Sequence, residues 1–137
     1  MACVAERKDV RFDPKQLLAA LDAFKRGDIL FILSQIAPNA TWRQSASLPW
    51  GGDYRGPEGA AEFFQKLDAT METVSFDVQE NIEAGDEVFS FGSYTGRGRA
   101  TGRTGSADWM FRWRLREGKV VSWESYIDTA AILAALD

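Results

Sequence analysis

Hydrophobic residues in the first part of the chain recur every three or four positions, which is the spacing of an amphipathic helix. The first run starts behind Asp13 and Pro14, residue types that favour an N-cap and a first helical turn, and it ends at Gly27. Its expected buried stripe consists of Leu17, Leu18, Leu21 and Phe24. The pattern therefore predicts a helix at the start of the fold.

Two more helices follow before the pattern changes. The second is shorter, starts behind Asp28, stops at Pro38, and carries Ile29, Ile32, Leu33 and Ile36. The third begins at Pro57, and its apolar positions are Ala60, Phe63, Phe64, Leu67 and Met71. Between them, residues 40–44 (ATWRQ) predict a short strand and residues 45–56 a long Gly- and Pro-containing loop.

From Thr73 onward the hydrophobic period is two, which predicts β-strands. Val74, Phe76, Val78 and Ile82 share one face of the first strand. Further strands are expected over residues 87–97 and 106–116 and from Lys119, followed by a short last helix capped by Asp128. Helices first and antiparallel strands afterwards predict an α+β fold, with a curved sheet packed under helices.

Composition narrows the class of protein. The 137 residues are 45% hydrophobic, which suits one domain spanning residues 1–137, with residues 1–11 as a flexible N-terminus. A net charge of −4 argues against a nucleic-acid surface, and the absence of a signal peptide or an apolar run long enough to span a bilayer predicts a cytoplasmic protein. The chain has no histidine and one cysteine, Cys3, which excludes Ser-His-Asp chemistry and His- or Cys-based metal sites.

Four stretches in order, LLAALDAFKRGDI, APNATW, YRGPEGAAEFF and LREGKVVSWESYID, resemble the SnoaL-like and ketosteroid-isomerase-like branch of the nuclear-transport-factor-2-like superfamily. The resemblance covers nearly the whole chain. It implies a cystatin-like cone in which a curved, mostly antiparallel sheet wraps around N-terminal helices. It also implies a cavity for a small, mostly apolar molecule, no metal or organic cofactor, and a homodimer formed through the convex face.

The catalytic groups of the best-known relatives are missing. Matching the ketosteroid isomerases places Ala20, Gln44 and Trp109 where that family has a tyrosine and two acids. Matching the limonene-epoxide-hydrolase-like branch places Ser125, Gly92 and Tyr94 where it has an acid, an arginine and another acid. Function must therefore be argued from the residues that this chain does have.

Strand parity, combined with the resemblance, predicts the wall of the cavity. On the last strand Val121, Trp123, Ser125 and Ile127 are expected to face inward, and Glu124 to face the convex side. The predicted ligand-binding residues are Trp42, Gln44, Trp50, Tyr94, Trp109, Phe111, Trp113, Trp123 and Ser125. An aromatic-lined cavity with few polar groups is typical of a small-ligand site, although the same aromatic residues also suit an ordinary core.

Asp53 and Tyr54 are the candidate catalytic residues, because the loop that carries them can cover the mouth of the cavity. Trp50 is expected to act there as a lid residue. The alternative is turn chemistry, in which Asp53 after Gly51 and Gly52 bonds to the backbone.

Three functions remain open on the sequence alone. The first is binding of a small apolar or aromatic ligand. The second is a cofactor-independent isomerase, cyclase or hydrolase acting on a small hydrophobic substrate. The third is a dimeric association domain whose convex face carries Met110, Arg112, Val120, Glu124 and Tyr126. A cavity filled by the protein's own side chains would favour association.

Overall fold

The computed structural model describes residues 14–137, with side chains from residue 18 onward. The expected flexible residues 1–11, the predicted cap Asp13 and the side chain of Leu17 lie outside this part. The elements, in chain order, are α2 (Pro14–Arg26), α3 (Ile29–Ser34), β1 (Ile36–Gln44), β2 (Gly52–Arg55), α4 (Gly56–Thr70), β3 (Met71–Ala84), β4 (Glu87–Gly98), β5 (Thr104–Arg116), β6 (Lys119–Ile127), α5 (Thr129–Leu133) and the 3₁₀ turn η2 (Ala134–Leu136).

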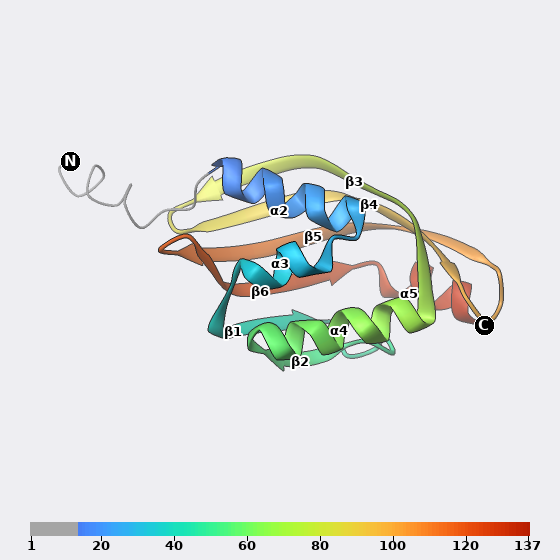
Figure 1. Ribbon diagram of the computed structural model, residues 1–137. Helices are drawn as coiled ribbons and strands as arrows, with labels where there is room; N and C mark the ends of the chain where they lie inside the picture. Colours follow the sequence, from blue (N-terminus) through green and yellow to red (C-terminus); the bar gives the residue numbers. More distant parts are fainter. Residues whose placement is uncertain (1–13) are drawn as a thin grey trace.

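The six strands form one sheet in the order β2-β1-β6-β5-β4-β3. Neighbouring strands are antiparallel except β1 and β6, which run parallel. The sheet curves, and α2, α3 and α4 lie against its concave side (Figure 1). This is the α+β cone that the sequence predicts. No helix of the described chain is long and apolar enough to cross a membrane.

The helix signals at Gly27, Asp28 and Asp128 are confirmed. Gly27 has φ +71°, the left-handed conformation that ends a helix and that glycine adopts without strain. The Asp28 carboxylate accepts a hydrogen bond from the Phe31 N–H (3.2 Å), and Asp128 accepts one from the Ala131 N–H (3.3 Å). Both aspartates are therefore N-caps, as predicted.

Two details of the N-terminal helices differ from prediction. Leu18 was expected in the buried stripe but is 58% exposed, because α2 turns Leu21 and Ala23 toward the core instead. The second helix ends at Ser34 and does not continue to Pro38, which lies within β1. Pro38 is tolerated there because the pairing of β1 with β6 is interrupted between Ile36 and Thr41, so no ladder hydrogen bond is lost.

Residues 45–56 are not one long loop. Gly52–Arg55 form the edge strand β2, which pairs antiparallel with β1 through Thr41–Gln44. Only residues 45–51 make the connection. The glycine and proline residues of this stretch interrupt the alternation of hydrophobic residues by which a strand is predicted.

The last strand contains a bulge that changes its parity. Arg114 pairs with Ser122 but Leu115 pairs with Val120, so Val121 is an extra residue. Val120 is therefore buried (3% exposed) and belongs to the core, which corrects its expected place on the convex face. Beyond the bulge, the parity of Trp123, Ser125 and Glu124 agrees with prediction.

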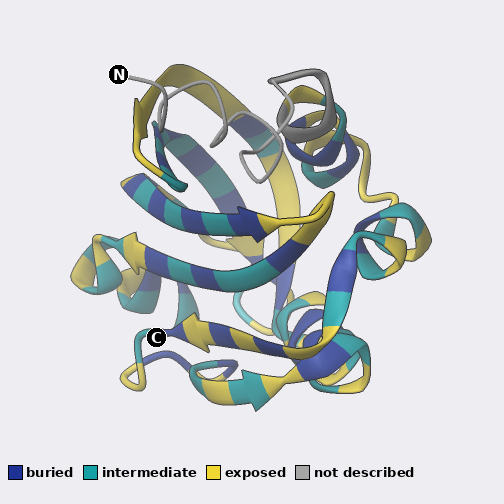
Figure 2. Ribbon diagram, turned by 90° about the vertical axis from the view of Figure 1, so that its left-hand side faces the viewer, coloured by how far each residue is buried: buried dark blue, intermediate teal, exposed yellow. Residues whose placement is uncertain are grey.

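Along β4 and β5, buried and more exposed positions alternate almost without interruption (Figure 2). β3 departs from this pattern: Phe76 is buried, but Val74, Val78 and Ile82 are exposed. β3 is the edge of the sheet and has two register shifts against β4, so its face does not stay turned to the core. The concave faces of β1, β4, β5 and β6 consequently supply most of the interior.

Candidate functional site

Five aromatic side chains line the concave face, and they are called the aromatic wall below: Trp42, Trp109, Phe111, Trp113 and Trp123. All are at most 6% exposed. Strand pairing brings them together, since Trp42 of β1 lies beside Trp123 of β6, which lies beside Trp113 of β5. The ring centroids of Trp42 and Trp123 are 4.2 Å apart, and those of Trp109 and Phe111 are 4.0 Å apart.

Phe24 of α2 packs into the middle of this wall. Its ring centroid lies 5.6 Å from that of Phe111, 5.9 Å from Trp113, 6.2 Å from Trp123 and 6.3 Å from Trp42. The predicted helix stripe included Phe24, but helical spacing alone does not reveal which rings it meets across the fold. In this conformation a side chain of the protein lies in the middle of the aromatic wall, an arrangement that by itself favours the association alternative.

Gly92 explains how Trp109 fits against the sheet. A Cβ atom at Gly92 would lie 2.4 Å from the Trp109 ring and 2.0 Å from the Asp77 carbonyl oxygen. Gly92 stands directly opposite Trp109 in the β4–β5 ladder. The position that matches an arginine in the epoxide-hydrolase-like branch is thus occupied here by an indole ring.

Several polar atoms on the concave side are buried without a hydrogen-bond partner of normal geometry. They are the indole N–H groups of Trp42, Trp109 and Trp123, the Tyr94 hydroxyl and the Ser125 hydroxyl. Trp113 differs, because its indole N–H donates to the Ser90 hydroxyl (3.1 Å). Buried polar groups normally have partners, so this concentration of unpartnered groups on one face requires an explanation.

Tyr94 keeps its proton in this setting. Burial raises the pKa of the Tyr94 phenol, and the opposing influences of the Thr73 side chain and the Arg99 charge are smaller. At neutral pH the hydroxyl is therefore a neutral hydrogen-bond donor and not a base.

Ser125 also borders a small hollow where β1 and β6 separate. The last paired residues of these strands are Arg43 and Glu124, and the hollow of about 220 Å³ lies just beyond them. Gln44 and Ser125, which are 6% and 4% exposed, belong to its lining. The Gln44 side-chain oxygen is already engaged, since it accepts a hydrogen bond from the Ser45 N–H (2.9 Å).

The predicted loop residues lie on or just before β2. Asp53 is exposed on β2 and lies 3.5 Å from the Arg43 guanidinium. The Tyr54 hydroxyl donates to the backbone carbonyls of Trp50 (3.0 Å) and Gly51 (3.3 Å). Trp50 is 3% exposed and packs in the core. Asp53 and Tyr54 line an open hollow with Glu58, Glu62 and Lys66, and Asp53 also borders the hollow lined by Gln44 and Ser125.

The interior holds no charged group within residues 18–137. Apart from the Tyr94 hydroxyl and the indoles, its buried polar side chains are Gln44, Ser90 and Ser125. The structure thus brings together the aromatic and neutral polar residues that parity predicts, and it leaves the Asp53 side chain exposed at the hollow that Gln44 and Ser125 also line.

Comparison with known proteins agrees with this fold. The SnoaL-like domain model matches residues 17–123. An NTF2-like protein from Burkholderia thailandensis E264 is 29% identical with a TM-score of 0.82, over 90% of this chain and 97% of that one. Another, from Burkholderia xenovorans LB400, is 33% identical with a TM-score of 0.75, over 90% and 92% of the two chains.

TerC, co-crystallized with polyporic acid, is 28% identical with a TM-score of 0.78, over 89% of this chain and 95% of that one. No curated protein matches the chain. The family model covers most of the sequence, and the fold built from its strands and helices agrees with it. The chain belongs to the SnoaL-like family of NTF2-like proteins.

Proposed function

We propose that this protein binds a small apolar or aromatic molecule against the aromatic wall, without a metal or an organic cofactor. The observation that carries this proposal is the set of buried polar groups without partners on the concave face. A largely apolar site with a few convergent polar groups is the usual form of a small-ligand site. A ligand that meets those groups would remove the cost of leaving them unbonded.

Binding requires Phe24 to give way, since its ring lies among the rings of the wall. Phe24 lies near the C-terminal end of α2, and Leu18 of the same helix faces solvent. Movement of this one side chain would free an aromatic-sized space without disturbing the sheet. The hollow beside Ser125 offers a second approach to the same face.

A binder is favoured over the isomerase, cyclase or hydrolase alternative. Acid–base catalysis needs a titratable group within hydrogen-bond reach of the substrate, and no buried carboxylate or amine stands on the concave face of residues 18–137. Asp53 is exposed and paired with Arg43. TerC, which was co-crystallized with polyporic acid, supports ligand binding by a protein of this fold.

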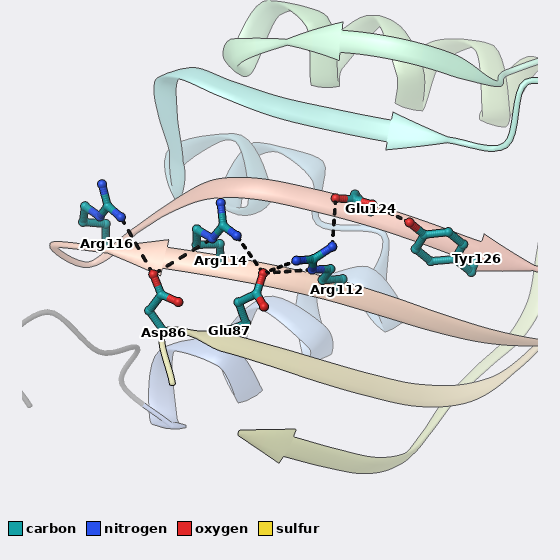
Figure 3. Close-up of polar contacts among 7 residues, drawn as sticks. All are labelled: Asp86, Glu87, Arg112, Arg114, Arg116, Glu124 and Tyr126. Atoms are coloured by element: carbon teal, nitrogen blue, oxygen red, sulfur yellow. Dashed lines mark hydrogen bonds and ion pairs between the residues drawn. The ribbon is translucent and has the colours of Figure 1, made fainter. Parts of the chain in front are cut away.

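We also propose that the protein forms a homodimer through its convex face. A ladder of charged residues crosses this face from Asp86 and Glu87 through Arg112 and Arg114 to Glu124 (Figure 3). Arg112 lies 2.7 Å from Glu87 and 3.8 Å from Glu124. Each acid is thus already paired within the chain, which lowers the desolvation cost of covering this face with a second copy. Phe89, Phe91 and Met110, which are half-buried beside the ladder, add apolar area to the same face.

The indole N–H resonances test the ligand proposal directly. On titration with 1-indanone, a compact aromatic ketone, we expect saturable shifts of the resonances of Trp42, Trp109 or Trp123 in a ¹⁵N-correlated spectrum, assigned by single Trp→Phe variants. Resonances that stay unmoved for all three residues, while the ligand is present at millimolar concentration, would contradict binding at this wall.

A further inference from the structure

Three of the unpartnered polar groups on the concave face can only donate. An indole N–H can only donate a hydrogen bond, and the N–H groups of Trp42, Trp109 and Trp123 are all unused. The Ser125 hydroxyl, which has no partner, can donate or accept, and so can the Tyr94 hydroxyl, which interacts with the Thr73 side chain. A ligand held here therefore meets several unused donors at one surface.

Two of the acceptors on the same face already have one partner each. The Ser90 hydroxyl accepts the Trp113 indole N–H, and the Gln44 side-chain oxygen accepts the Ser45 N–H. A ligand acceptor can meet three indole N–H groups that can only donate, whereas a ligand N–H or O–H group must share the remaining lone pairs of a few neutral oxygens. The face thus discriminates between ligand acceptors and ligand donors.

The interior also discriminates against charge. No arginine, lysine or carboxylate is buried among residues 18–137, so an ionised ligand would leave water without a counter-charge. The charged residues that line the hollow beside Ser125 are Arg43, Asp53 and Glu124; Arg43 pairs with Asp53, and Glu124 pairs with Arg112. Neutral ligands are favoured for this reason.

We infer that the ligand is a neutral aromatic compound with carbonyl-type acceptors, such as a ketone, lactone or quinone, held by indole N–H and hydroxyl donors of the concave face. This inference rests on the proposed function. It adds a chemical class to the site, because a wall of rings alone would accept any apolar molecule of suitable size.

Four compounds with the same two-ring skeleton test this class: 1-indanone, indane, indane-2-carboxylate and 2-aminoindane, each titrated calorimetrically into the protein at pH 7. We expect 1-indanone to bind tightest, about two- to twelvefold tighter than indane for each hydrogen bond gained. The carboxylate and the ammonium compound should bind weakest. Equal or tighter binding of indane, or of either ion, would overturn the inference while leaving the proposed function intact. If none of the four binds, the proposed function fails first.

Trp→Phe variants show which indole N–H groups cause the preference for 1-indanone over indane. The preference for 1-indanone over indane should fall toward one in at least one of Trp42→Phe, Trp109→Phe and Trp123→Phe. Trp113→Phe is the matched control, because its N–H is already bonded to Ser90 and its loss should change both affinities alike. A preference that survives all three variants, or that falls equally in Trp113→Phe, would show that free indole N–H groups do not select the ligand.

Discussion

At the scale of single residues, Ser125 bears most directly on whether the site binds a ligand or catalyses a reaction. It stands on the concave face where related enzymes carry an acid, it is 4% exposed, and its hydroxyl has no partner. A serine acts as a nucleophile only with a base to take its proton, and no histidine exists in the chain. Under the proposed function, the hydroxyl therefore holds a ligand and does not attack it.

Replacing Ser125 with Ala should weaken binding of 1-indanone by about 0.5–1.5 kcal/mol, the net value of one neutral hydrogen bond. The same change removes an unsatisfied buried hydroxyl, so the ligand-free protein should become more stable to urea by up to about 1 kcal/mol. Calorimetry and urea denaturation measure the two effects. A substrate whose turnover at saturation falls a thousandfold in this variant, with binding unchanged, would instead make Ser125 catalytic.

The residues of the wall were predictable because strand side chains alternate with a period of two. This rule placed Trp109, Phe111 and Trp113 on one face from sequence alone. It failed at Val120, where a bulge inserts one extra residue that no local pattern reveals. The unpartnered state of the indole N–H groups was equally invisible, because it depends on contacts between strands.

Among the elements, α2 has the closest bearing on the site, because it delivers Phe24 to the centre of the aromatic wall. The sequence predicted the helix and its end at Gly27, since both depend on local signals. It did not predict that the ring would occupy the expected cavity. That outcome is set by the curvature of the sheet over the helix.

Phe24→Ala should produce two opposite effects. Loss of a half-buried ring should lower the free energy of unfolding by about 1–3 kcal/mol, less than the 3–5 kcal/mol of a fully buried phenylalanine. The space released should increase the affinity for 1-indanone. Leu30→Ala, at an 82% exposed position of α3, is the control and should change neither. Unchanged or weaker affinity in Phe24→Ala would show that the ring is core and not a displaceable plug.

The loop prediction failed at the level of elements as well. Residues 45–56 were expected to act as a lid, but β2 ties Gly52–Arg55 to β1 and fixes Asp53 on the outer edge. Strand pairing of this kind depends on a partner strand, so composition alone favours a loop. The catalytic roles predicted for Asp53 and Tyr54 stay predictions, with Asp53 exposed at the hollow that Ser125 also lines.

For the whole molecule, we expect a dimer at micromolar concentration, measured by light scattering. Arg112→Glu would place a third acid beside Glu87 and Glu124 and should produce monomers. Arg26→Glu is the matched control, because Arg26 also pairs with two acids, Asp22 and Asp28, but lies on a helix away from the convex face. A wild-type monomer, or equal dissociation in both variants, would contradict the proposed interface.

The overall architecture was accessible from sequence because each segment has a strong local period and the order of segments is characteristic of the family. We expect the cone to hold a small aromatic ligand against the aromatic wall. A crystal structure of the protein grown with saturating 1-indanone tests it most directly. We predict ligand density against Trp42 and Trp123, with the Phe24 ring displaced. Phe24 in its present place, with density absent or confined to the open hollow beside Asp53 and Lys66, would contradict it.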